Sequence, residues 1–205
     1  MQRGDNMSWT KGTGVGYAKV GENEDYVIDA KASHLRVHAF ANGLIAAVAH
    51  SPKFEIREWM GETQLSSNNL DKGPIRITVN PSALDLVDEV RESERREIYR
   101  VMHSEVLETS KFPEIVFDGQ WRVADHPGRD QYTVNVEGSL RLHGVTSTHM
   151  FEARVTLGPD SFRAHGEFIV FQREYGINTA SIAGSTLRLR DELKFSFFVV
   201  GRKKA

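Results

Sequence analysis

Alternation of apolar and polar residues is the dominant pattern along this sequence. The clearest run covers residues 132–142, where Tyr, Val, Leu and one Gly occupy every second position and polar residues lie between them. After His143-Gly144 the alternation returns, most clearly over residues 151–157. A period of two is typical of a strand with one buried face, and a short turn signal between two such runs predicts a long antiparallel hairpin.

Shorter segments predict further strands. They lie at residues 34–38, 54–57, 75–79, 114–117 and 162–171, and the last of them ends apolar on both faces. A final strand begins near Leu187 and resumes at Leu193, with Asp191-Glu192 expected as a bulge or tight turn. The total is roughly eight strands, which could pack as a sandwich or close as a barrel. A barrel of about eight strands is wide enough to hold one small ligand.

One segment departs from the period of two. Over residues 93–107 the apolar positions are three and four apart, at Ile98, Val101, Met102 and Val106. This spacing predicts an amphipathic helix of about four turns, and Ser93 is expected as its N-cap. Pro113 then restarts extended chain. Residues 82–90 could form either a loop or a short helix.

The composition indicates one globular domain. The chain has 205 residues, of which 40% are hydrophobic and 26% charged, and its formal net charge is -2. We expect a flexible N-terminal arm at residues 1–22 and one folded domain at residues 23–205. The charge pattern indicates no nucleic-acid partner. No stretch approaches the roughly 20 apolar residues of a membrane-spanning helix.

The sequence offers little catalytic or metal-binding chemistry. The absence of cysteine excludes disulfides, thiolate nucleophiles and metal–thiolate sites. There is no Gly-x-Ser-x-Gly motif. His143 and His149 flank the predicted turn, but no third ligand is evident, and we expect His143 to order its turn through a backbone hydrogen bond. We therefore expect no catalytic residue, no metal and no cofactor.

The N-terminus carries no sign of export. No apolar segment follows Arg3, so we expect no signal peptide and a cytoplasmic protein. A leader removed before the first residue would instead make the protein periplasmic. The lack of cysteine is compatible with either compartment.

Five segments together carry a resemblance to a known family. They are residues 26–35 (YVIDAKASHL), 105–117 (EVLETSKFPEIVF), 138–146 (GSLRLHGVT), 175–177 (YGI) and 190–192 (RDE). Their order and spacing resemble the YceI-like family of lipocalin-like polyisoprenoid-binding proteins, over about residues 26 to 200. The segment at residues 43–51 departs from the plainest members. The resemblance implies an all-β fold with one accompanying helix, an eight-stranded antiparallel lipocalin-like barrel, often dimeric, with a long apolar chain in its lumen.

Alternation reports which residues are buried, and it does not distinguish a hollow lumen from a packed core. The pattern by itself favours a packed core, whereas the resemblance implies a lumen. On the second reading the expected ligand-binding residues inside the barrel are Phe54, Ile56, Val134, Val136, Leu140, Phe168, Val170, Phe195 and Phe197. A register error of one residue would turn the affected strand's residues outward.

Arg173 is the one charged residue included among the expected ligand-binding residues. It comes shortly after the predicted strand at residues 162–171, whose last residues are apolar on both faces, so it could lie at the barrel mouth. A cation there would suit a phosphate, phenol or carboxylate head group. The alternative is an exposed loop arginine, which the sequence favours.

The leading functional hypothesis is non-enzymatic binding, storage or transport of a long linear apolar ligand. The candidate ligands are a polyisoprenoid, an isoprenoid quinone or a fatty acid or amide, and the expected partners are this lipid and a second copy of the chain. One alternative is an enzyme acting on a small apolar substrate in the barrel, which would need a buried ionisable group in the lumen. Another is a structural or stress-response interaction module with a filled core.

Overall fold

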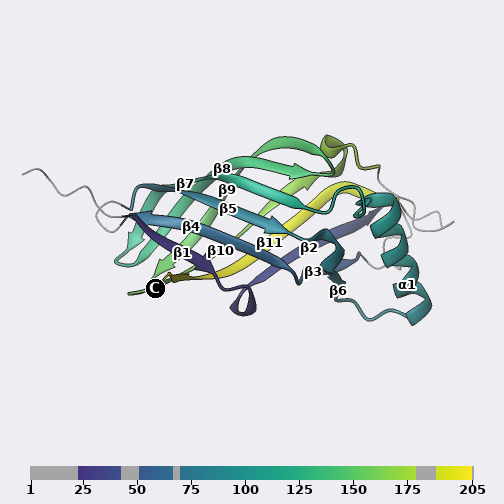
Figure 1. Ribbon diagram of the computed structural model, residues 1–205, viewed down its shortest axis with the longest axis horizontal. Coiled ribbons are helices and arrows are strands. Elements are labelled where there is room, and N and C mark those ends of the chain that lie inside the picture. Colours follow the sequence, from purple (N-terminus) through teal and green to yellow (C-terminus); the bar gives the residue numbers. More distant parts are fainter. Residues whose placement is uncertain (1–22, 43–50, 67–69, 179–187, 205) are drawn as a thin grey trace, which may run out of the picture.

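The strands form a closed antiparallel barrel (Figure 1). Its wall has eight positions, here called staves, and each stave is either one long strand or two shorter strands in line. The structure is a computed structural model that describes residues 23–42, 51–66, 70–178 and 188–204. The expected N-terminal arm at residues 1–22 lies outside the described residues. Five staves are single long strands: β7 (Ile115–Gly128), β8 (Gln131–Leu142), β9 (Val145–Leu157), β10 (Ser161–Phe171) and β11 (Arg188–Lys203). The predicted eight-stranded barrel with one accompanying helix is confirmed.

Each of the other three staves consists of two strands separated by a break. The pairs are β1 (Asn23–Ile28) with β2 (His34–Asn42), β3 (Lys53–Ile56) with β4 (Trp59–Ser66), and β5 (Lys72–Val79) with β6 (Leu84–Leu86). Around the barrel, β4 pairs with β1 and β5, and β3 pairs with β2 and β6. The long strand β11 pairs with both β1 and β2, which closes the barrel.

Hydrogen bonds hold the three breaks in place. The first break contains the 3-10 helix η1 (Ala30–Ala32). There the Ser33 hydroxyl donates to Asp29 O at 2.6 Å and accepts from Val200 N at 2.9 Å, which ties the break to β11. Such a side chain substitutes for the ladder bonds that a bend removes.

The other two breaks are bonded to each other. Asn80 N donates to Glu58 O at 2.9 Å, and Arg57 N donates to Ala83 O at 3.1 Å. The 3-10 helix η3 (Pro81–Ala83) and the short strand β6 occupy most of the segment that the sequence left open between loop and helix.

The predicted helix forms one residue earlier than expected. It consists of α1 (Glu92–Val101) followed by a π-helical stretch, η4 (Met102–Val106). Ile98, Val101 and Met102 are buried, as their spacing predicts. The N-cap is Arg91, which makes no side-chain cap bond, so the prediction of Ser93 as N-cap is wrong. Glu92 and Glu94 lie in the first turn, where the helix dipole favours negative charge.

The helix covers a gap in the barrel wall. At this end β6 and β7 do not pair, and α1 lies beside the free edge of β6 (Figure 1). Leu86 N donates to the Tyr99 hydroxyl at 2.9 Å, and Arg95 Nη1 donates to Leu86 O at 2.8 Å. These side chains satisfy backbone groups that an edge strand would otherwise expose. No helix in the described residues is long and apolar enough to span a bilayer.

Two local predictions on the strands are confirmed. His143 and Gly144 have φ angles of 51° and 76°, and they join β8 to β9 in a tight two-residue turn. Positive φ at both central residues is typical of a type I′ hairpin turn. A register shift between Leu189 and Leu193 shows that Asp191-Glu192 lies in a bulge of β11.

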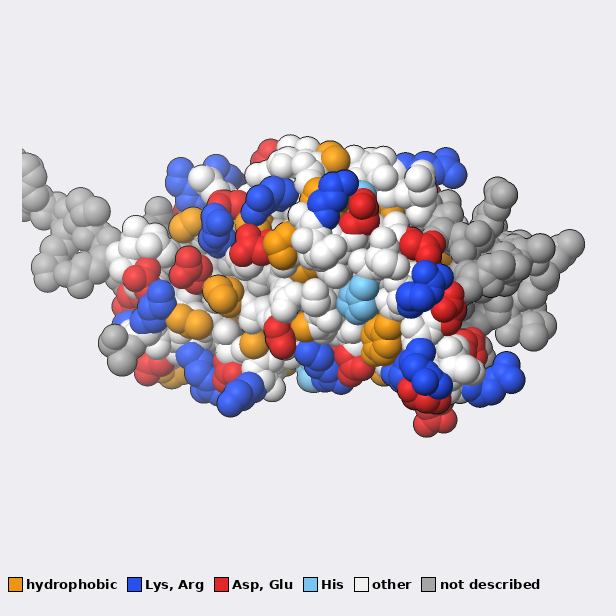
Figure 2. Space-filling model, turned by 45° about the vertical axis from the view of Figure 1, so that its right-hand side comes forward, with side chains coloured by type: hydrophobic (Ala, Val, Ile, Leu, Met, Phe, Trp, Pro, Cys, Tyr) orange, Lys and Arg blue, Asp and Glu red, His pale blue; other side chains and the backbone are white. Residues whose placement is uncertain are grey.

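The face of the molecule that Figure 2 shows is charged and mixed. Figure 2 shows Lys and Arg interspersed with Asp and Glu over the visible face, with hydrophobic side chains scattered among them. Such a surface is typical of a solvated barrel wall and contrasts with the apolar interior.

Candidate ligand-binding cavity

The barrel encloses a main chamber of about 200 Å³. All eight staves contribute lining residues, which are mostly Leu, Val, Ile and Phe. None of the described residues that line it carries a charge. The interior of this barrel is therefore hollow along part of its length, which the alternation alone could not establish.

A second chamber of about 110 Å³ lies at the helix end, between the barrel and the α1–η4 helix. Ile98, Met102 and Val106 of the helix form part of its lining. The two chambers adjoin, because the following residues line both: Ile56, Val79, Ile115, Leu142 and Phe195. The two chambers therefore share part of one apolar wall.

A row of aromatic rings crosses the main chamber wall. The rings of Phe151 and Phe168 stack with centroids 4.5 Å apart and an interplanar angle of 14°. Phe168 in turn stacks on Phe195 at 5.2 Å and 11°. Phe197 packs edge-on against Phe151 at 5.8 Å. Aromatic rings bury large apolar areas at low conformational cost, so this row is a rigid surface for a hydrocarbon chain.

Two polar side chains stand out in the lining. In the main chamber, the Thr63 hydroxyl donates to Pro74 O at 2.6 Å and accepts from Trp121 Nε1 at 2.9 Å. In the helix-end chamber, Gln172 is only 2% exposed, and its Nε2 donates to Arg190 O at 2.9 Å. Gln172 is the one polar residue among the described residues that line this second chamber.

Eight of the ten predicted site residues line the chambers. Phe54 lines the helix-end chamber, and Ile56 and Phe195 line both. The others line the main chamber: Val134, Val136, Leu140, Phe168 and Phe197. The period of two placed these residues correctly because every second residue of a regular strand faces the same side. Their contact with a ligand stays a prediction.

Val170 and Arg173 are outside both linings. Val170 is fully buried, but it packs with Leu142, Tyr175 and Ile177 in a solid cluster. Arg173 is exposed in the 3-10 helix η5 (Gln172–Tyr175), and its backbone N donates to Asp191 Oδ1 at 2.9 Å. Arg173 is thus an exposed arginine, the alternative that the sequence favoured, because the chain turns into η5 immediately after β10. Its neighbour Gln172, which the sequence analysis missed, faces the cavity instead.

The two histidines near the hairpin turn both bind Tyr175. His143 Nδ1 lies 3.2 Å from Tyr175 O, and its Nε2 lies 2.9 Å from Glu108 Oε2. The expected backbone hydrogen bond of His143 therefore fastens the turn to η5. His149 Nε2 lies 2.5 Å from the Tyr175 hydroxyl. Burial lowers the pKa of His149 and raises the pKa of Tyr175 to about 12.

Neither histidine contributes to a metal site or to the cavity lining. His149 and Tyr175 lie beside the main chamber, outside both linings. Within the described residues, no group of three His, Asp or Glu side chains is close enough to hold a metal ion.

The family model of the YceI-like domain matches residues 26–200. This chain belongs to the YceI-like family. The match runs from within β1 to within β11 and confirms the resemblance carried by the five sequence segments. No curated protein sequence matches this YceI-like chain significantly.

Solved structures share the fold at low sequence identity. BcnA of Burkholderia cenocepacia is 15% identical with a TM-score of 0.65, and the match covers 84% of this chain and 98% of BcnA. A polyisoprenoid-binding domain of Saccharophagus degradans, implicated in plant cell wall breakdown, is 13% identical with a TM-score of 0.63, over 87% and 98% of the two chains. The YceI protein of Campylobacter jejuni is 10% identical with a TM-score of 0.54, over 77% and 87%.

Proposed function

We propose that this YceI-like protein binds a long, linear apolar molecule in its two adjoining chambers and stores or transports it unchanged. The observation that carries the proposal is a pair of adjoining cavities whose described lining has no charged residue. A polyisoprenoid is the first ligand class to test, because a structural neighbour is a polyisoprenoid-binding domain. An isoprenoid quinone and a fatty acid or amide are the other candidates.

The energetics of burial favour a long chain over a small molecule. Each methylene group removed from water contributes about 0.8 kcal/mol. Association costs at least about 4 kcal/mol in lost translational and rotational freedom. A short hydrocarbon barely offsets that cost, whereas a chain that extends through both chambers exceeds it. The stacked rings of Phe151, Phe168 and Phe195 provide contact along that path.

The lining supports binding without catalysis. An enzyme in this barrel would need an ionisable group that reaches the substrate. Among the described lining residues only Tyr132 has a titratable side chain. His149 has the lowered pKa that a catalytic base could show, but it is bonded to Tyr175 outside the lining. Storage or transport is therefore the function that we propose.

The decisive experiment is extraction of the purified protein with organic solvent, followed by mass spectrometry. We expect one apolar compound in stoichiometric amount. An empty extract, combined with no binding of long-chain lipids added in vitro, would refute the proposal.

A matched pair of variants on β8 tests whether the ligand lies inside the barrel. Leu140→Asn places an amide in the main chamber, and Arg141→Asn places the same group on the exposed face of the same strand. We expect the amount of extracted ligand to fall several-fold for Leu140→Asn only, with circular dichroism confirming that both variants fold.

We also propose that the protein is a homodimer. Light scattering on the purified protein measures the molar mass that tests this proposal.

A further inference from the structure

We infer that the bound molecule is an uncharged amphiphile, oriented with its polar head against Gln172 in the helix-end chamber and its hydrocarbon tail in the main chamber. This inference rests on the proposed function and narrows its ligand class. It would favour amides, alcohols and carbonyl compounds over free fatty acids and prenyl phosphates. Three observations carry it: the charge of the lining, the position of Gln172 and the bonding of the polar groups in the main chamber.

The described part of the lining disfavours a charged head group. No described residue that lines either chamber carries a charge. A carboxylate or phosphate that enters such a site loses its hydration without gaining a cation or a set of donors. Arg173 and Arg190 are near in sequence to Gln172 and to its acceptor, but both side chains are exposed and line neither chamber. A carboxylic acid would therefore bind mainly in its protonated form.

Gln172 gives the helix-end chamber its polarity. It is the first residue of η5, directly after β10, and its side chain is almost completely buried. The bond from Nε2 to Arg190 O holds the amide in place. A primary amide has two donor hydrogens and an oxygen with two lone pairs, so this bond uses only part of its capacity. A neutral head group with a hydroxyl, amide or carbonyl is a suitable partner.

Among its described lining residues the main chamber has three hydroxyl groups, on Thr63, Tyr132 and Ser196, and no amide side chain. The Thr63 hydroxyl donates to Pro74 O and accepts from Trp121 Nε1, so its donor hydrogen and one lone pair are occupied. Tyr132 and Ser196 also line this chamber and are half-buried, and the rest of its described lining is aliphatic or aromatic. A polar head would lose hydrogen bonds there, and a hydrocarbon tail loses none. The two chambers therefore set one orientation for the ligand.

The test compares octadecanamide, octadecanol and octadecanoate, which share one chain length and differ in the head group. Each displaces an uncharged fluorescent naphthylamine dye from the unmodified protein, below the concentration at which the lipid aggregates. At pH 8 we expect the amide and the alcohol to bind at least tenfold more tightly than octadecanoate. The difference should shrink as the pH falls towards about 4.3, the ordinary pKa of such a carboxyl. The helix-end chamber itself has no titratable residue among its described lining.

Equal or tighter binding of octadecanoate at pH 8 overturns the uncharged head group and leaves the proposed function standing. Failure of all three lipids to bind overturns the proposed function and the inference together. Gln172→Leu then tests the orientation, with Gln120→Leu on the exposed face of β7 as its matched control. We expect about fivefold weaker binding of octadecanamide for Gln172→Leu only, and no change for octadecane. Unchanged amide binding by a folded Gln172→Leu protein overturns the assignment to Gln172.

Discussion

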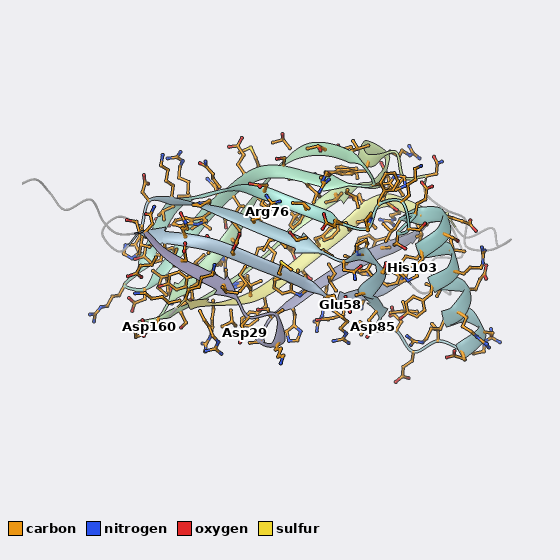
Figure 3. The ribbon with its side chains drawn as sticks, in the orientation of Figure 1. Asp29, Glu58, Arg76, Asp85, His103 and Asp160 are labelled. Carbon is orange, nitrogen blue, oxygen red and sulfur yellow. The ribbon has the colours of Figure 1, made fainter. Side chains whose placement is uncertain are left out.

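The two ends of the barrel are closed in different ways. At the end that carries the β9–β10 turn, backbone ladders continue to the rim, because β1 pairs with both β4 and β11 and Lys203 N donates to Asp160 O at 3.0 Å. At the helix end, β6 and β7 do not pair, and side chains of α1 bridge the gap. In Figure 3, Asp160 lies at the first end and His103 at the second.

A second difference lies in the seam between β9 and β10. Their ladder pairs Leu157 with Phe162 at the turn end and stops at Ala153 and Gly166, although both strands continue towards the helix end. Tyr175 of η5 is bonded to His149 of β9 in this region. Side-chain closure opens at lower free energy than a continuous ladder. The end with the polar residue Gln172 is therefore the end that side chains close, where the backbone ladder is incomplete.

The largest expected effect is at the ladder-closed end, at Gly201. A Cβ atom there would lie 2.0 Å from Phe162 Cε1, and the Phe162 ring is buried against Tyr26. We expect Gly201→Ala to lower the free energy of unfolding by about 3 kcal/mol, measured by urea denaturation.

Gly176 is the matched glycine at the helix end. Its φ is 68°, and a Cβ atom would meet nothing within 4 Å. Gly176→Ala should therefore cost only the backbone strain, about 1 kcal/mol. A larger loss for Gly176→Ala than for Gly201→Ala would contradict the expectation that the close approach of Gly201 to Phe162 dominates.

A smaller effect is expected from removing the Tyr99 hydroxyl. This group accepts from Leu86 N and donates to Asp85 Oδ1 at 3.1 Å, so Tyr99→Phe leaves a backbone donor of β6 without its partner. We expect a loss of about 1 to 2 kcal/mol and faster hydrogen exchange at the Leu86 amide. In Tyr26→Phe, the control at the other end, the hydroxyl lost makes only a 3.4 Å bond to Glu24, so we expect little change. Equal exchange at Leu86 before and after Tyr99→Phe would show that α1 does not hold this edge.

The smallest effect concerns pH and Glu55 on β3, in the half of the barrel nearer the helix. Burial by itself raises the pKa of this carboxyl, but hydrogen bonds from Arg36 at 2.7 Å and His34 at 2.8 Å together outweigh burial and lower the pKa. The charged form therefore contributes stability above the unfolded-state pKa of about 4.3, and the contribution is lost as the pH falls through the folded pKa.

Glu55→Gln should be less stable than the unmodified protein at pH 7, and the difference should narrow at pH 4. Urea midpoints at the two pH values measure it. Glu137→Gln, on the exposed face of β8, is the control and should show no such narrowing. If the stability difference narrowed equally in both variants, the hydrogen bonds of Glu55 with Arg36 and His34 would contribute no specific stability.

Local patterns predicted the elements well, because their causes are local. Alternation placed Val134 and Val136 inside, since successive residues of a strand face opposite sides. The three- and four-residue spacing of Ile98, Val101 and Met102 placed the helix against the barrel. His143-Gly144 predicted the hairpin because few residues other than Gly and Asn accept a positive φ readily. The prediction of Ser93 as the N-cap was wrong because capping depends on backbone geometry that the residue type only suggests.

The sequence by itself determined which residues are strand, helix and turn, and which faces are buried. The tertiary structure decided whether the buried interior is hollow, because a cavity depends on the number and stagger of the staves and on contacts between distant residues. It placed Val170, within the apolar run at residues 168–171, in a solid cluster, and Gln172, the next residue after that run, in a chamber. It also decided where three of the staves break into two strands. At these breaks, hydrogen bonds between neighbouring strands replace the regular ladder.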